Sequence, residues 1–189
     1  MIPADVLLKG YSIGYFPMAD EDGSISWYSP DPRAIIPISE RNIPRSTKQL
    51  LRKEKFSIEI DNRFEDVMRG CAGREETWIS EEIIQSYVEL HKLGYAHSVE
   101  AVDSTGLVGG LYGVALGAAF FGESMFSKRS GGSKVALAFL IRHLLVQGFT
   151  LLDTQYTTPH LEMFGAIEIP KAKYVHLLEE AIGRKTKFV

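Results

Sequence analysis

The most constraining feature of this sequence is the stretch from residue 96 to residue 155, where strand-like and helix-like patterns follow one another. Residues 96–126 consist of strand-like segments separated by the turn sequences DSTG and LG, which predicts an antiparallel meander of three strands. Residues 133–148 are apolar over much of a helix circumference, and residues 149–155 resemble a further strand. We therefore expect a helix buried against the sheet, capped by Ser133 and ended by Gly148.

The rest of the chain predicts flanking helices and a division near residue 38. Helical patterns cover residues 4–16, 62–73, 80–94, 160–166 and 170–182, and residues 56–61 alternate like a strand. Ser80 is a suitable N-cap for the third helix, and Gly94 follows its end. Residues 20–38 contain three prolines and a glycine. We expect a small N-terminal segment, residues 1–38, packed on a main domain, residues 39–189.

Composition excludes several classes of protein. Cys71 is the single cysteine, so an internal disulfide framework and a cysteine-rich zinc site are excluded. The five histidines have no metal-ligand spacing, and we expect no metal. No apolar run approaches the roughly 20 residues that span a bilayer, and the start lacks the pattern of a secretory signal. These features favour a cytoplasmic protein with no membrane partner.

The charge distribution is uneven, although the net charge is only −3. Residues 40–55 hold six Arg or Lys against two Glu, a local charge of +4. Arg45, Lys48 and Arg52 are spaced three and four apart, so a helix would place them on one face. That face is either solvated or a contact for the phosphates of a nucleic acid.

The strand-like segment TLLDTQ carries two polar residues among apolar ones. Side chains alternate along a strand, so Asp153 and Gln155 are expected to point the same way. They either cap a neighbouring turn or belong to a site. Glu123, in GESMFS, is a second carboxylate with the same two interpretations.

The element order has the layout of acyl-CoA N-acetyltransferase domains, which are α+β folds with a mixed sheet and flanking helices. In those domains the loop after the meander binds pyrophosphate at a helix N-terminus. Here the corresponding loop is SKRSGGSK, which has glycines and positive charge but only part of the expected arrangement. A shared fold does not fix a shared function.

A set of strings gives a more specific resemblance: GYFPM, WYSPDPRA, TWIS, LHKLGYAHSVE, LVGGLYGVALG, FFGESMFS, SKVAL, LLDTQ and HLEMFGA. In this order, over nearly the whole chain, they resemble the leucyl/phenylalanyl-tRNA–protein transferases. The resemblance implies transfer of Leu or Phe from aminoacyl-tRNA to the α-amine of proteins that begin with Arg or Lys, which marks them for proteolysis. It implies no cofactor, since the aminoacyl ester is already activated. Methionyl-tRNA is a further donor to test, and we expect a monomer.

The resemblance also implies roles for particular residues. In the relay that it implies, Gln155 contacts the attacking amine and Asp153 polarises Gln155. Because a carboxamide is a very poor base, we expect instead that the pair orients and desolvates the amine and that Asp153 attracts it while it is positive. Glu123 would be a partner for the amine or for the cationic acceptor side chain. Trp78 would stack on the terminal adenine of the tRNA, with Met18 at the position where the family usually has a second Trp. The tRNA backbone would contact Arg45, Lys48, Arg52 and Lys53. The side-chain pocket would be formed by Leu111, Phe120, Met125, Leu140, Leu144 and Leu152.

Two other functions remain open at this stage. An acyl-CoA-dependent N-acetyltransferase would use the same fold, and would need a competent pyrophosphate loop. A noncatalytic tRNA-binding protein would keep the scaffold, although Asp153, Gln155 and Glu123 argue against it. Relatives often have Met at the position of Leu111 and Phe at that of Leu140, which leaves the preferred donor open, and Met18 in place of the usual Trp leaves the strength of tRNA binding open.

Overall fold

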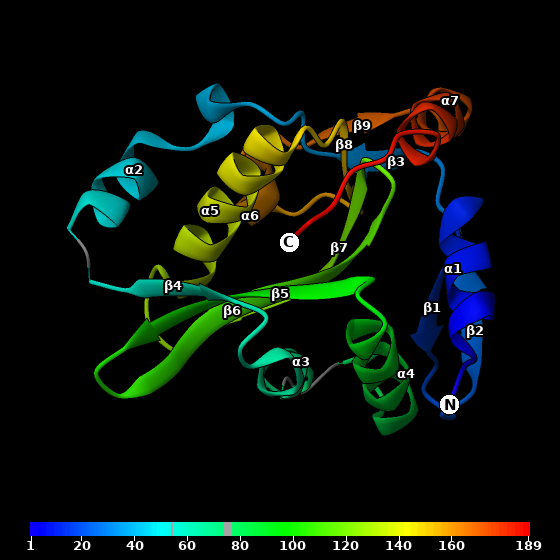
Figure 1. The fold of residues 1–189 in the computed structure, drawn as a ribbon, viewed down its shortest axis with the longest axis horizontal. Coiled ribbons are helices and arrows are strands. Elements are labelled where there is room, and N and C mark those ends of the chain that lie inside the picture. Colours follow the sequence, from blue (N-terminus) through cyan, green and yellow to red (C-terminus); the bar gives the residue numbers. More distant parts are fainter. Residues whose placement is uncertain (54, 74–76) are drawn as a thin grey trace.

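The computed structural model describes residues 1–53, 55–73 and 77–189, and a mixed sheet is its central layer (Figure 1). Within the described residues this sheet has seven strands. All neighbouring strands are antiparallel, except that β7 and β8 are parallel to each other. In spatial order they are β4 (Ser57–Ile60), β5 (Ala96–Asp103), β6 (Gly106–Leu116), β7 (Ala119–Ser127), β8 (Leu151–Gln155), β3 (Arg33–Ile35) and β9 (Ile167–Ile169). The expected α+β class is confirmed.

The expected meander and buried helix are confirmed, with one correction. Strands β5, β6 and β7 pair antiparallel in sequence order, and helix α5 (Gly132–Gln147) follows them. Gly148 ends α5 in a left-handed conformation, as expected. The prediction of Ser133 as N-cap is wrong: Gly131 occupies that position with φ +96°. This positive φ favours glycine, and a Cβ would in addition lie 2.3 Å from the Cδ2 atom of Leu50 in helix α2 (Arg45–Arg52).

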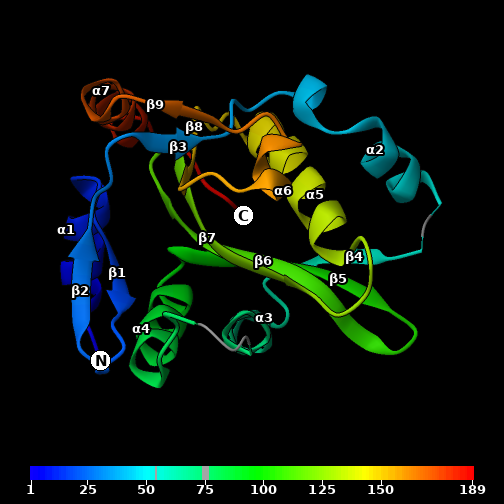
Figure 2. The ribbon, with the colours of Figure 1, turned by 180° about the vertical axis from the view of Figure 1, so that it is seen from behind.

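Helices cover both faces of the sheet. Helix α5 packs on one face, with α2 and the short α6 (Pro159–Glu162) beside it (Figures 1 and 2). Helices α3 (Phe64–Ala72) and α4 (Glu81–Lys92) cover the other face. Ser80 caps α4 by accepting a hydrogen bond from the backbone N–H of Ile83, as predicted. Among the described residues, no helix combines the length and apolar character that crossing a bilayer requires.

The N-terminal segment forms a small layer of its own at one end of the molecule. It contains α1 (Ala4–Ser12) and a two-stranded sheet of β1 (Phe16–Ala19) and β2 (Ile25–Tyr28). This layer packs beside α4 and α7 (Lys171–Ile182) (Figure 2). The chain then enters the large sheet at β3 and passes through a short 3-10 helix (Glu40–Asn42) to α2. The division near residue 38 stays a prediction. Strand β3 lies before that residue and yet belongs to the large sheet.

Strands β7 and β8 pair only over a short length. Their parallel pairs run from Ala119 with Leu151 to Phe121 with Asp153, whereas β7 continues to Ser127. The crossover between these parallel strands is α5. Beyond the last pair the two strands diverge, and α5 does not fill all the space between them. A cavity lined by residues of all three elements lies there.

The C-terminal residues 184–189 run back against the core, where Phe188 is buried. Its ring stacks on the rings of His97 and Phe120, with centroids 4.4 and 5.2 Å apart. The Phe188 carbonyl accepts a hydrogen bond of 2.6 Å from His143 Nε2. Phe120 and Leu144, both expected in the aminoacyl pocket, lie in this same core cluster.

We predict that Phe188→Ala lowers the free energy of unfolding by about 3 kcal/mol, because large-to-small changes of buried aromatic residues cost that much. Val189→Ala is the matched control, since the Val189 side chain is largely exposed. Urea unfolding of both variants checks the prediction. A loss below about 1 kcal/mol for Phe188→Ala would mean that the tail contributes little to the core.

Candidate active site

A cavity of about 430 Å³ opens between the diverging strands β7 and β8. Roughly 150 Å³ is enough to hold a benzene ring, so a leucine or phenylalanine side chain fits with room for the group attached to it. The walls come from β6, β7, α5, β8 and the segment around α6. Most of the lining surface is apolar, as expected for a site that binds a hydrophobic group.

Four of the six residues expected in the aminoacyl pocket line this cavity. They are Leu111 on β6, Met125 on β7, Leu140 on α5 and Leu152 on β8. Leu137 and Leu161 extend the apolar wall and were not predicted. Phe120 and Leu144 are fully buried behind it, against Phe188, and are not among the lining residues. The apolar wall therefore has two layers, an inner one that a ligand would touch and an outer one that supports it.

Asp153 lies behind the cavity in a fully buried ion pair with Arg33 of β3. Arg33 Nε and Nη2 donate to the two carboxylate oxygens at 3.0 and 2.7 Å. The Tyr174 hydroxyl donates to Oδ2 at 2.7 Å, and the backbone N–H of Gln155 donates to Oδ1 at 2.9 Å. Burial alone would lower the pKa of the Arg33 guanidinium, but the Asp153 carboxylate outweighs it, and the pKa of Arg33 lies above its usual value.

Gln155 reaches into the cavity from the end of β8, and its backbone has φ 58°. A left-handed conformation is uncommon for a residue other than glycine. It ends the strand alternation, so the Gln155 side chain does not simply lie beside that of Asp153 as the strand pattern predicted. The contact between the two residues runs through the backbone N–H of Gln155, and the Gln155 carboxamide Nε2 donates to Glu123 Oε1 at 3.2 Å.

Glu123 is a carboxylate at the polar edge of the cavity. It lies on β7, half-buried, and its Oε2 lies 3.5 Å from the Tyr87 hydroxyl, which in turn is hydrogen-bonded to the Tyr11 hydroxyl. Burial, together with the nearby Asp153 charge, raises the pKa of Glu123 to about 8, although the tyrosine hydroxyls and Arg33 partly oppose this. Burial and Glu123 also raise the pKa values of Tyr11 and Tyr87, so both phenols stay protonated donors.

Sequence reasoning missed Arg33, Tyr87, Tyr174 and Tyr11 as residues of this site. Arg33 occurs in WYSPDPRA, immediately before a short apolar run, and a charged residue at the start of a buried strand was an available signal. The three tyrosines look like core residues in the sequence. Their roles depend on where their hydroxyl groups point, which the sequence pattern does not contain.

Trp78 and Met18 lie near each other, but only Trp78 lines the cavity. The backbone N–H of Ala19 donates to the Trp78 carbonyl at 3.1 Å, which joins β1 to the segment before α4. Both side chains are half-buried and pack against the same part of the core. The arrangement brings together the two residues that the resemblance assigns to the adenine.

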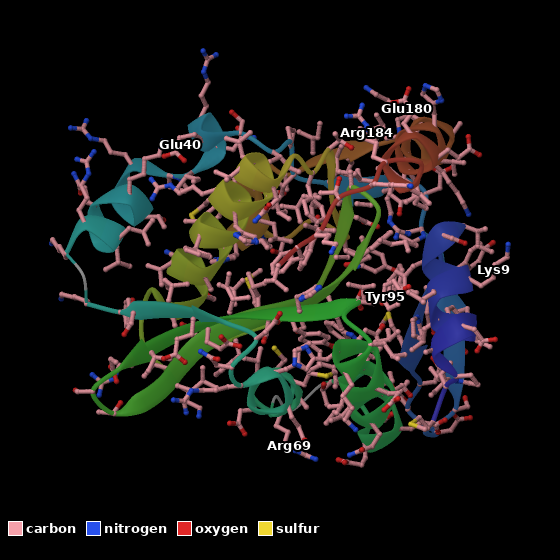
Figure 3. All side chains as sticks on the ribbon, viewed as in Figure 1. Lys9, Glu40, Arg69, Tyr95, Glu180 and Arg184 are labelled. Atoms are coloured by element: carbon pink, nitrogen blue, oxygen red, sulfur yellow. The ribbon has the colours of Figure 1, made fainter. Side chains whose placement is uncertain are left out.

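Helix α2 presents a basic face on the outer side of α5. The side chains of Arg45, Arg52 and Lys53 are exposed, and no ion pair to them is formed within the described residues. Lys48 is different, because its Nζ donates to the Glu40 carbonyl at 2.7 Å and lies 3.8 Å from the Glu40 carboxylate. Glu40 is labelled in Figure 3. Three of the four predicted phosphate contacts are therefore available to a ligand without breaking an ion pair between described residues.

We searched the described part of the chain for side chains that could bind a metal ion. Within it, no group of three or more His, Cys, Asp or Glu residues is placed to hold a metal ion. His160 lines the cavity, and burial and the nearby Lys134 lower the pKa of its imidazole, so the ring is neutral at pH 7.

The raised pKa of Glu123 gives a prediction for Glu123→Gln. An unfolded glutamate ionises near pH 4.3, so between that value and about 8 the native protein holds a proton that the unfolded chain has released. The stability that Glu123 contributes is fully present below the unfolded pKa and is lost as pH rises through the folded pKa. Glu123→Gln has no ionisable group at this position, so its stability does not fall with pH for this reason.

We therefore expect the stability of Glu123→Gln relative to wild type to increase with pH across this window, by up to ~1.4 kcal/mol per pH unit. Urea unfolding of both proteins at several pH values between 5 and 9 measures the difference. Parallel stability profiles for the two proteins would show that Glu123 ionises normally.

Comparison with known proteins identifies the family. A sequence profile described as leucyl/phenylalanyl-tRNA protein transferase matches residues 35–179, and a profile for the N-terminal domain of the same proteins matches residues 1–31. A protein from Herpetosiphon aurantiacus named leucyl/phenylalanyl-tRNA–protein transferase is 53% identical over 97% of this chain and 96% of its own length. A protein of the same name from Chlorobium luteolum is 47% identical over the full length of both chains.

Solved structures resemble this chain in fold at low sequence identity. A functionally unknown conserved protein from Staphylococcus epidermidis aligns with a TM-score of 0.50 and 12% identity, over 90% of this chain and 65% of that one. A GCN5-related N-acetyltransferase-like protein from Streptococcus suis aligns with a TM-score of 0.44 and 14% identity, over 87% of this chain and 63% of that one. The profiles and the full-length relatives show that this chain belongs to the leucyl/phenylalanyl-tRNA–protein transferase family and is an enzyme of that family.

Proposed function

We propose that this enzyme moves Leu or Phe from the 3′ end of an aminoacyl-tRNA to the α-amine of proteins that begin with Arg or Lys. The added residue would mark the acceptor for proteolysis. Charged tRNA and newly made proteins occur in the cytoplasm, and the proposal includes that location and a monomeric enzyme. The observation that supports it most is the cavity, which combines an apolar interior, a polar edge at Glu123 and Gln155, and an aromatic wall at Trp78.

The division of the cavity into apolar and polar parts suits an aminoacyl ester. The donor side chain would lie against Leu111, Leu140 and Leu152, which excludes charged donors because burying their charge is costly. The ester carbonyl would then lie near the polar edge. The adenine would stack on Trp78, since a flat aromatic surface binds a base regardless of its sequence context.

The reaction needs a group that takes a proton from the acceptor ammonium. A carboxamide is a very poor base, so Gln155 is suited to holding the amine through its carbonyl oxygen while its Nε2 donates to Glu123. An α-ammonium has a pKa near 7.7–8.0, close to the pKa of about 8 of Glu123. Matched values favour proton transfer. In the proposed step, the ammonium first gives one proton to the Glu123 carboxylate, and the free amine nitrogen attacks the ester carbonyl carbon. The bond from that carbon to the ribose oxygen then breaks, and the ribose oxygen takes a second proton from the attacking nitrogen and leaves as a hydroxyl.

The glycines of SKRSGGSK have a structural explanation that does not require acyl-CoA. A Cβ on Gly131 would collide with Leu50, and a Cβ on Gly132 would lie 3.0 Å from the Val108 carbonyl. Close packing of this loop against α2 and β6 accounts for both residues. Little in the loop then favours the N-acetyltransferase alternative.

Single-turnover transfer tests the proposal directly. The donors are leucyl-, phenylalanyl- and methionyl-tRNA, and the acceptors are peptides that differ only in an N-terminal Arg, Lys or Ala. We expect transfer of Leu or Phe to the Arg and Lys peptides and little to the Ala peptide. Transfer to all three peptides would contradict the acceptor assignment. Binding of acetyl-CoA in calorimetry, without aminoacyl transfer, would favour an N-acetyltransferase, and tRNA binding without transfer would favour a noncatalytic protein.

A further prediction concerns the adenine contact. Trp78→Ala should raise KM for aminoacyl-tRNA by roughly tenfold, because base–aromatic stacking contributes ~1–3 kcal/mol. Met18→Ala is the comparison, and should have a smaller effect, since Met18 lies outside the cavity wall and a thioether stacks less well. Steady-state kinetics and melting temperature are measured together. A Trp78→Ala protein with a lower melting temperature but unchanged tRNA affinity would assign Trp78 to the core.

A further inference from the structure

We propose that Arg33 and Asp153 act together as positioning residues, which hold Gln155 in its reactive conformation without touching the substrate amine. This inference rests on the proposed function and assigns a role to Arg33, a residue outside the cavity wall. It also changes the role of Asp153, whose charge we expected from the sequence to attract the amine. Three observations carry it: the saturation of the Asp153 carboxylate, the backbone of Gln155, and the immobilisation of Arg33.

The Asp153 carboxylate has no acceptor position left for a substrate. A carboxylate offers about four lone-pair sites, and here four hydrogen bonds occupy them. Two come from Arg33, one from the Tyr174 hydroxyl and one from the backbone N–H of Gln155. The side chains of Arg33 and Asp153 are 1% and 0% exposed. An acceptor ammonium would have to displace Arg33 from a buried bidentate pair, and breaking such a pair is strongly unfavourable.

The fourth of these hydrogen bonds explains how Asp153 influences the reaction. It fixes the backbone N–H of Gln155 at the point where the chain turns into the left-handed region, with φ 58°. The next backbone N–H, of Tyr156, lies 2.6 Å from the Thr154 carbonyl, so the turn is tight. This turn directs the Gln155 side chain to Glu123 and into the cavity. Without the Asp153 acceptor, the uncommon conformation would lose its main stabilising contact.

Arg33 in turn is held from several sides. Its Nη1 donates to the Gly14 carbonyl at 3.0 Å, and its guanidinium lies between the rings of Phe16 and Tyr174, 5.0 and 4.5 Å from their centroids. Gly14 and Phe16 belong to the N-terminal segment, and Tyr174 belongs to α7. The position of Gln155 is therefore determined by three parts of the chain that are distant in sequence.

A double-mutant cycle tests the inference. Asp153→Asn and Arg33→Gln each leave one buried charge without its partner, and a small displacement of a reacting group lowers kcat by roughly 10²-fold. The pair Arg33→Gln/Asp153→Asn contains two neutral amides that still donate and accept hydrogen bonds. We expect it to transfer Leu or Phe roughly tenfold faster than either single variant, with KM near wild type and an unchanged pH profile of kcat.

If Asp153 instead acts on the amine through its charge, the double variant will be as slow as Asp153→Asn, and the inference is wrong. Where a single variant does not fold, the double variant compared with wild type decides in the same way. A kcat within roughly tenfold of wild type supports a positioning role, and a loss of 10²-fold or more contradicts it. Arg69→Gln is the matched control, since Arg69 pairs with Glu65 and Glu81 on the outer side of α3 (Figure 3).

Hydrogen exchange separates this inference from the proposed function. The backbone N–H of Gln155 should be protected in wild type and should exchange faster in Arg33→Gln, with no change in Arg69→Gln. This result is expected whether or not the protein transfers amino acids. An inactive wild type with the same exchange pattern would contradict the proposed function alone. Equal exchange of the Gln155 amide in wild type and Arg33→Gln would contradict the positioning role.

Discussion

The buried ion pair between Arg33 and Asp153 is the interaction on which the rest of this site depends. It joins β3 to β8, and its neighbours Gly14, Phe16 and Tyr174 bring in the N-terminal segment and α7. Two charges removed from water are stable only when their hydrogen-bonding positions are filled, as they are here. Because every hydrogen-bonding position of the Asp153 carboxylate is filled, its neighbours have little freedom to move. One of them is the backbone N–H of Gln155, so the ion pair fixes Gln155 at the cavity.

The cavity itself follows from the topology of the sheet. Parallel strands β7 and β8 pair over three residues and then diverge. Beyond this pairing the two strands supply the polar Glu123 and Gln155, and α5 supplies leucines. Burial therefore raises the pKa of Glu123, whereas Asp153, one strand away, is paired with Arg33 at 2.7 Å. Two carboxylates with opposite environments have different roles.

Local patterns predicted much of this fold. The meander, the buried α5, its end at Gly148 and the cap at Ser80 all depend on contacts between residues close in sequence. The pairing of Arg33 with Asp153 spans 120 positions and leaves no local pattern. The resemblance places Phe120 and Leu144 in the pocket, whereas in the fold both belong to the core cluster that contains Phe188, a contact that no local pattern predicts. Gly131 occupies the cap position of α5 that we expected for Ser133, with φ +96° and with Leu50 of α2 packed against it, a contact that the local sequence does not contain.

The most direct test of this account is a crystal structure with an unreactive donor and an acceptor bound together. A phenylalanyl-adenosine with an amide in place of the ester cannot be transferred, and a short peptide with N-terminal Arg supplies the amine. The account predicts that the peptide nitrogen lies within hydrogen-bonding distance of Gln155 and Glu123, with the bond between Arg33 and Asp153 intact. A peptide nitrogen bound to the Asp153 carboxylate, with Arg33 displaced, would contradict it.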